Sequence, residues 1–149
     1  MKQAHSITLK VFVKEGEDYG KIKEAFLSFL PFELEKEKIK INEISAKGFE
    51  EKKIIILESI LTKERHTNKF LESLLEKLES GEKQRILLLK EPRLDENADF
   101  FLRFEKNELL ENRKLALTDS GNCFHIKISI AAFPKSGENA LKAVQGIFS

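Results

Sequence analysis

The stretch Phe124-His125-Ile126-Lys127-Ile128-Ser129-Ile130, residues 124–130, alternates between large apolar and polar side chains. Successive side chains of a β-strand point to opposite faces, so this pattern predicts a strand with one buried face and one polar face. Residues 7–13 and 100–104 alternate in the same way and predict two more strands. Strands of this kind belong in a sheet that carries a hydrophobic core on one side only.

Three other stretches carry apolar side chains at the helical period. Residues 22–30, 70–78 and 140–148 each have apolar residues spaced by three and four, which predicts three helices with one apolar stripe each. Thr62 and Ser136 stand where their side chains can cap the second and third of these helices. A helix with a single stripe packs on one sheet face. We therefore expect an α+β fold, a single mixed β-sheet with helices packed mainly on one face.

The remaining strands are predicted from shorter patterns. Residues 38–42 alternate around two isoleucines and predict a second strand. Residues 53–61 are rich in isoleucine on both faces, which favours a central strand. Residues 116–118 and 124–131 flank the turn Asp119-Ser120-Gly121-Asn122 and predict a hairpin. The expected order is β-α-β-β-α-α-β-β-β-α.

Length and composition favour one intracellular domain. A chain of 149 residues with 41% apolar residues suits a single α+β domain, residues 1–149. One cysteine excludes a disulfide framework, and no apolar run resembles a signal peptide or membrane span, so we expect a cytoplasmic protein. The high Lys and Glu content resembles thermophile usage. With 26 Lys and Arg against 25 Asp and Glu, any nucleic acid has to bind a local basic patch.

No motif in the sequence predicts catalysis, a cofactor or a metal. The glycines are scattered and form no nucleotide-binding loop. Cys123 and His125 lie two residues apart in an expected strand, so they share a face and offer two metal ligands, but no spacing completes the set. Neither residue has the helix-start or oxyanion-loop context of a catalytic pair. We expect no catalytic residue, no metal and no cofactor.

The polar sides of the expected strands carry cations beside aromatic rings. One cation lies on the polar side of each of four strands: Lys10, Lys40, Arg103 and Lys127. Phe12 and Phe101 lie on the same side. This combination suits single-stranded RNA, because bases stack on rings and phosphates pair with cations. Two other interpretations stay open: the lysines only solvate an outer sheet face, or this face contacts a protein partner, including a second copy of the chain.

Three parts of the sequence resemble one known family. They are Arg93-Leu94-Asp95 with Phe101-Leu102-Arg103 and Lys106, the run from Leu117 to Ile128, and Ala131-Ala132-Phe133-Pro134. Together they resemble the signature of a small archaeal family labelled RNA-binding or predicted exosome subunit. The resemblance implies a fold similar to ribosomal protein L5, RNA as the partner, and association with RNA-processing or ribosomal proteins. It adds Arg93 and Lys106 to the candidate RNA-binding residues.

Two details of this resemblance bear on the site. Asp95 could cap a turn while Arg93 pairs with it or with a nearby carboxylate, or both could contact a ligand. Relatives tend to carry a Gly-aromatic-aromatic-Gly-Asn turn before the third strand. This chain instead has Ala46-Lys47-Gly48-Phe49-Glu50-Glu51-Lys52, so we assign no binding role to the Gly48 loop. The full candidate set is Lys10, Lys40, Arg93, Arg103, Lys106 and Lys127.

Overall fold

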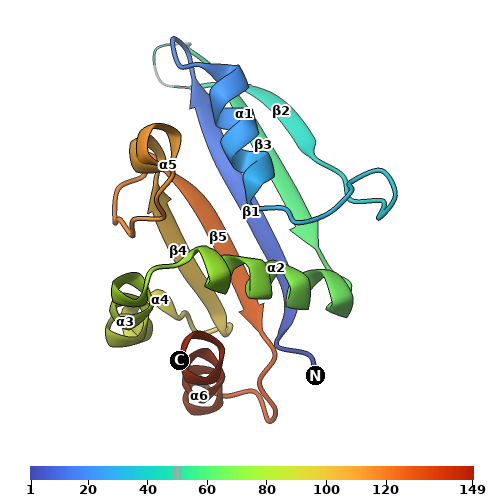
Figure 1. Ribbon diagram of the computed structural model, residues 1–149, viewed down its shortest axis with the longest axis vertical. Helices are drawn as coiled ribbons and strands as arrows, with labels where there is room; N and C mark the ends of the chain where they lie inside the picture. Colours follow the sequence, from blue (N-terminus) through green and yellow to red (C-terminus); the bar gives the residue numbers. More distant parts are fainter. Residues whose placement is uncertain (49, 51) are drawn as a thin grey trace.

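The computed structural model describes residues 1–48, 50 and 52–149, and Figure 1 shows the path of the chain. Residues 49 and 51 of the Gly48 loop are outside the described residues, so the structure does not test how that loop departs from the family turn. The elements in chain order are β1 (Ala4–Lys14), α1 (Tyr19–Ser28), β2 (Asn42–Lys47), β3 (Lys53–Leu61), α2 (Glu64–Lys77), α3 (Ser80–Leu88), α4 (Lys90–Arg93), β4 (Asp99–Glu105), α5 (Lys106–Asn112), β5 (Cys123–Ile130) and α6 (Gly137–Phe148).

The described strands form one five-stranded sheet in the order β2-β3-β1-β5-β4. The α+β class and the single sheet are confirmed, although each pairing is antiparallel and the sheet is therefore not mixed. β3 is an interior strand, flanked by β2 and β1, while β1 occupies the middle of the sheet. β3 is thus interior in the sheet, but the isoleucines on one of its faces are not all buried, since Ile60 is 50% exposed.

The alternating strands bury one set of side chains against the helices. The side chains expected in the core are all buried: Ile7, Leu9, Val11, Phe124, Ile126, Ile128 and Ile130 of the sheet, with Phe26, Leu74 and Val144 of the helices. Figure 1 shows α1 and α2 lying over the same side of the sheet. The other side carries the alternate side chains of each strand, and we call it the open face.

The outer edge of β4 is covered by two short segments. Leu94 forms a bridge with Phe100, and Leu117 forms a bridge with Phe104. The expected hairpin between residues 116–118 and 124–131 is therefore wrong. β5 already has β1 and β4 on its two sides, so residues 116–118 pair with the free edge of β4 instead. Covering this edge leaves less unpaired backbone for another strand to join.

Two other local predictions needed correction. β2 begins at Asn42 and not at residue 38, because residues 33–38 form turns. These turns end at Lys38, which has a φ of 57°, and the following Ile39 amide donates a hydrogen bond to the Leu34 carbonyl. Thr62 does not cap α2, whose N-cap is Lys63 without a side-chain hydrogen bond. Ser136 does cap α6, since its side chain accepts a hydrogen bond from the Asn139 amide. Among the described residues, no helix has the length and apolar character needed to cross a membrane.

Candidate nucleic-acid interface

The strand register aligns the side chains of the open face in rows. One row crosses all strands of the sheet through Asn42, Glu58, Lys10, His125 and Arg103. The adjacent row on one side contains Ile60, Thr8, Lys127 and Phe101. The adjacent row on the other side contains Ile44, Ile56 and Phe12. Side chains directly opposite each other have Cβ atoms about 4.5–5.5 Å apart, so each row is a line of neighbours.

These rows divide the open face into two halves of different chemistry. The cationic half, on β1, β5 and β4, consists of Lys10, His125, Lys127, Phe101 and Arg103. The apolar half, on β2, β3 and the end of β1, consists of Phe12, Ile44, Ile54, Ile56 and Ile60. The structure thus brings together three cations named from the sequence with one of the two phenylalanines. Phe12 belongs to the apolar half.

The three strand cations differ in how far their charge is compensated. The Lys10 ammonium lies 3.2 Å from a carboxylate oxygen of Glu58 on β3. The Arg103 guanidinium donates a hydrogen bond of 3.2 Å to the backbone carbonyl of Asp119. Lys127 forms no salt bridge within the part of the chain that the structure describes. Lys127 and Arg103 therefore keep the most charge available for an anion.

His125 lies among these cations and responds to their charge. Burial lowers the pKa of the His125 ring, and the charges of Arg103, Lys10 and Lys127 lower it further. The ring centre lies 5.7 Å from that of Phe101, which is partly buried on the neighbouring strand. A phosphate bound here would favour the protonated ring, because an opposite charge stabilises the charged form. Burial is the larger cause of the lowered pKa, and the part contributed by Arg103, Lys10 and Lys127 reflects local positive charge.

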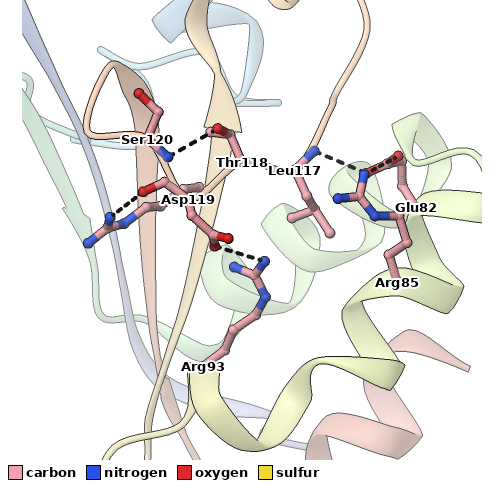
Figure 2. A network of polar contacts seen from close by, with 8 residues as sticks. Glu82, Arg85, Arg93, Leu117, Thr118, Asp119 and Ser120 are labelled. Atoms are coloured by element: carbon pink, nitrogen blue, oxygen red, sulfur yellow. Dashed lines mark hydrogen bonds and ion pairs between the residues drawn. The ribbon is translucent and has the colours of Figure 1, made fainter.

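Arg93 lies beyond the edge of β4, next to the cationic half. It is the last residue of α4, and its Nη2 lies 3.8 Å from the Oδ1 of Asp119 (Figure 2). Arg93 and Asp119 line a cavity of about 360 Å³ together with Leu89, Pro92, Phe101 and Arg103. Asp95 caps the turn before β4, since its Oδ1 accepts hydrogen bonds of 2.9 Å from the amides of Asn97 and Asp99. Arg93 therefore pairs with a carboxylate distant in sequence and not with Asp95.

The loop that carries Asp119 is held by contacts to α3 and β4. Glu82 of α3 accepts a hydrogen bond of 3.0 Å from the Leu117 amide and also pairs with Arg85 (Figure 2). The Thr118 amide donates to the Arg103 carbonyl, and the Ser120 amide donates to the Thr118 hydroxyl. The backbone around Asp119 is therefore fixed, whereas its side chain is fully exposed.

Two candidate residues lie away from the cationic half. Lys106 is only 1% exposed, and its ammonium contacts the Phe12 carbonyl at 2.7 Å and a Glu17 carboxylate oxygen at 3.1 Å. A lysine buried in this way has a structural role, which corrects its place among the surface candidates. Lys40 is exposed, but it precedes β2, and its carbonyl accepts a hydrogen bond from the buried Ser59. Lys40 is thus not in the rows of the open face.

The chemistry of Cys123 and His125 does not suggest a catalytic pair. Both lie on the open side of β5, opposite Glu105 and Arg103 on β4. Burial raises the pKa of the Cys123 thiol, which is the opposite of what a reactive thiolate requires. Within the described residues, no group of three or more His, Cys, Asp or Glu side chains could hold a metal ion.

Two features of this surface are absent from the sequence-based predictions. The first is the apolar half, where Ile44 and Ile60 are each 50% exposed. Isoleucine on both faces of residues 53–61 is the available signal, but it favours a central strand and does not by itself indicate an exposed apolar surface. The second is Asp119, which approaches Arg93 only because residues 116–118 run along β4. No sequence spacing indicates that contact.

The chain matches a family model described as RNA binding over residues 6–130. It is also similar to a curated relative, the RNA-binding protein PAB1135 from Pyrococcus abyssi (strain GE5 / Orsay). The two are 27% identical over 143 residues, which make up 96% of this chain and 92% of the relative.

Solved archaeal structures have a similar fold over nearly the whole chain. Protein AF2318 from Archaeglobus fulgidus, assigned to the DUF54 family, is 26% identical with a TM-score of 0.84, covering 97% of this chain and 99% of that one. Mth689 from Methanothermobacter thermautotrophicus, a DUF54 protein, is 27% identical with a TM-score of 0.76, covering 99% of both chains.

Proposed function

The chain belongs to the RNA-binding family whose model matches residues 6–130, and we propose that it binds single-stranded RNA through the cationic half without catalysing a reaction. Membership of an archaeal RNA-binding family, expected from the sequence motifs, is confirmed. The likeness to ribosomal protein L5 stays a prediction.

One observation carries this proposal: cations from three adjacent strands lie on the same half of the open face as Phe101, which is partly buried. Lys127 pairs directly with Phe101 across the β5–β4 register, and Arg103 pairs with His125 in the neighbouring row. An unpaired base can stack on the Phe101 ring while the flanking phosphates contact Lys127 and Arg103. In double-stranded RNA the bases remain stacked on one another, so this ring favours unpaired nucleotides.

The low net charge is consistent with an RNA-binding site that makes only a few contacts. A net charge of +1 gives no long-range field to attract RNA, so affinity has to come from a few local contacts. Each cation that pairs with a phosphate contributes about one unit to the slope of log affinity against log salt concentration. The proposal therefore implies weak binding that depends on salt through a small number of side chains.

The test is a titration of labelled single-stranded RNA at two salt concentrations. Lys127→Ala should weaken binding to all sequences and lower the salt slope by about one unit. Arg103→Ala should have the same effect and lose in addition any stacking, worth on the order of 1–3 kcal/mol by analogy with aromatic platforms. Lys142→Ala is the matched control, because Lys142 is an exposed lysine of α6. If both strand variants bind like the control, the site lies elsewhere.

Association with RNA-processing machinery such as the exosome, or with ribosomal proteins, is part of the proposal. The resemblance noted from the sequence supports it. Purification of the tagged protein from an archaeal lysate, with and without ribonuclease, would separate the two routes to a complex. Components that are retained after ribonuclease treatment would indicate direct protein contacts, and their loss would indicate that RNA bridges them.

The apolar half supports a second candidate function, contact with a protein partner or a second copy of the chain. Phe12, Ile44 and Ile56 form one row, with Phe12 41% and Ile44 50% exposed. Apolar side chains grouped in this way are typical of protein interfaces. Sedimentation of the wild type and of Ile44→Asp tests self-association. A dimer that the variant loses would support this function, and a monomer at all concentrations would exclude a second copy as the partner.

A further inference from the structure

The cavity beside β4 is lined by two arginines and one carboxylate group: Arg93 contacts the Asp119 carboxylate, and Arg103 donates to the Asp119 backbone carbonyl. Arg103 belongs to β4 and Arg93 to the end of α4, and Asp119 contacts both of them. Figure 2 shows the contact between Arg93 and Asp119. Two guanidinium groups against a single acid leave the cavity with an excess of positive charge. An anion with more acceptor oxygens than a carboxylate would fit this surplus better.

Arg93 is poorly satisfied in its present contacts. Its side chain is only 11% exposed, and its Nε is buried without a hydrogen-bond partner among the described residues. Its contact with Asp119, at 3.8 Å, is an ion pair too long for a hydrogen bond. A buried guanidinium carries five donors in a rigid fork, and unused donors of this kind are costly. The geometry thus leaves Arg93 ready for a better acceptor.

Asp119 can leave this contact at little cost. Its side chain is fully exposed and its carboxylate is already hydrated, so little is lost when it turns away from Arg93. Its backbone stays in place, because the Asp119 carbonyl accepts from Arg103 and the adjacent Thr118 amide bonds to β4. The carboxylate therefore occupies the anion position without being fixed there.

We infer that this cavity takes the phosphate group of one unpaired RNA nucleotide between Arg93 and Arg103, and that the phosphate displaces the Asp119 carboxylate. The inference rests on the proposed function and adds a defined phosphate subsite to it. Phe101 lines the same cavity and lies next to Lys127, so the nucleotide continues directly onto the cationic half. A volume of about 360 Å³ is at the small end of ligand sites and suits one nucleotide.

An internal phosphodiester and a terminal phosphate offer the same chemistry to the two arginines. The difference is one of charge, since a terminal phosphate carries up to two negative charges and a diester carries one. Oligonucleotides of one sequence with a 5′-phosphate, a 3′-phosphate or only hydroxyl ends distinguish these sources. Tighter binding of one phosphorylated form points to a terminal phosphate, and equal binding of all forms points to an internal phosphate.

The first test removes the competing carboxylate. Asp119→Asn should bind single-stranded RNA about twofold to fivefold more tightly, because an exposed ion pair is lost from the free state only. Glu138→Gln is the matched control, since it makes the same chemical change at an exposed acid of α6 that pairs with Lys142. Tighter binding of Asp119→Asn alone supports the subsite. Equal affinities of the two variants would overturn it.

The second test does not depend on RNA. The Nε–H signal of Arg93 is followed by NMR while adenosine 5′-monophosphate, inorganic phosphate or adenosine is added to the wild type. The two phosphates should shift this signal and adenosine should not, and Arg103→Lys, which keeps the Arg93 signal, should weaken the response. No shift with either phosphate would overturn the subsite.

The two tests separate this inference from the proposed function. If RNA binds and Lys127→Ala weakens it, but Asp119→Asn and the Arg93 signal show no effect, the proposed function stands and the subsite is wrong. If RNA does not bind even at low salt while Arg93 responds to phosphate, the proposed function fails and the cavity is a phosphate site of another kind. That second result also overturns the inference, because the inference assigns the cavity to RNA.

Discussion

Lys106→Met tests the structural role that burial gives to this lysine. The substitution removes the ammonium but keeps a long, unbranched apolar side chain. In the wild type the ammonium donates to the Phe12 carbonyl and to Glu17, where the β1–β5 register ends at the pair Val11 and Phe124. Lys106 thus ties the start of α5 to the end of β1 and to the turn before α1.

The expected loss of stability follows from these two contacts. Leaving the partly buried Phe12 carbonyl without its donor costs about 1–3 kcal/mol. Glu17 is 26% exposed, so water replaces part of its ion pair and the added cost is only about 1 kcal/mol. We therefore expect Lys106→Met to lower the free energy of unfolding by about 2–4 kcal/mol.

Urea unfolding followed by circular dichroism measures this difference. Lys127→Met is the matched control, because Lys127 lies on the open face and should change stability by less than about 0.5 kcal/mol. The double variant with Glu17→Gln gives the coupling between the two side chains, which should differ from zero. A Lys106→Met protein as stable as the wild type, with weaker RNA binding, would refute the reasoning and return Lys106 to the interface.

Three further predictions concern single side chains. Burial and neighbouring cations lower the pKa of His125, so below about pH 6.5 the unfolded chain binds more protons than the folded protein. Acid therefore lowers the free energy of unfolding, and His125→Gln should make this decrease smaller. Bound RNA phosphate favours the protonated His125 ring, so the RNA affinity of the wild type should rise as pH falls, by at most about tenfold per pH unit. The rise should be steeper than for His125→Gln, and identical pH profiles of the two proteins would contradict this. Cys123→Ala should fold and keep its RNA affinity, whereas stoichiometric zinc that is lost in this variant would overturn the non-enzyme proposal. Ser136→Ala should lose about 1 kcal/mol in urea unfolding, and no change would mean that the cap contributes nothing.

The sequence predicts the core well because strand alternation is a local signal. Residues 124–130 alone place Phe124 and Ile126 on one face and His125 and Lys127 on the other, and both assignments hold in the structure. The pairing of residues 116–118 could not be predicted in the same way. The order of strands in the sheet determines this pairing, because β1 and β4 occupy both sides of β5 and leave no edge for residues 116–118.

The candidate site shows the same limit. Lys10, Arg103 and Lys127 were placed together from their strand faces, which depend only on alternation. Lys106 was assigned from a family motif, and a motif does not show that its ammonium is turned toward Phe12 and Glu17. The contact between Arg93 and Asp119 joins residues 26 positions apart through two covering segments of β4, beyond the reach of any local pattern.

The location of RNA on the protein tests the central claim most directly. Backbone amide signals are recorded by NMR while a short single-stranded RNA is added at low salt. The proposal predicts that the largest shifts fall on β4 and β5 around Phe101, Arg103, His125 and Lys127, with little change on α1 and α2. Shifts concentrated on α1 and α2, with β4 and β5 unchanged, would contradict it.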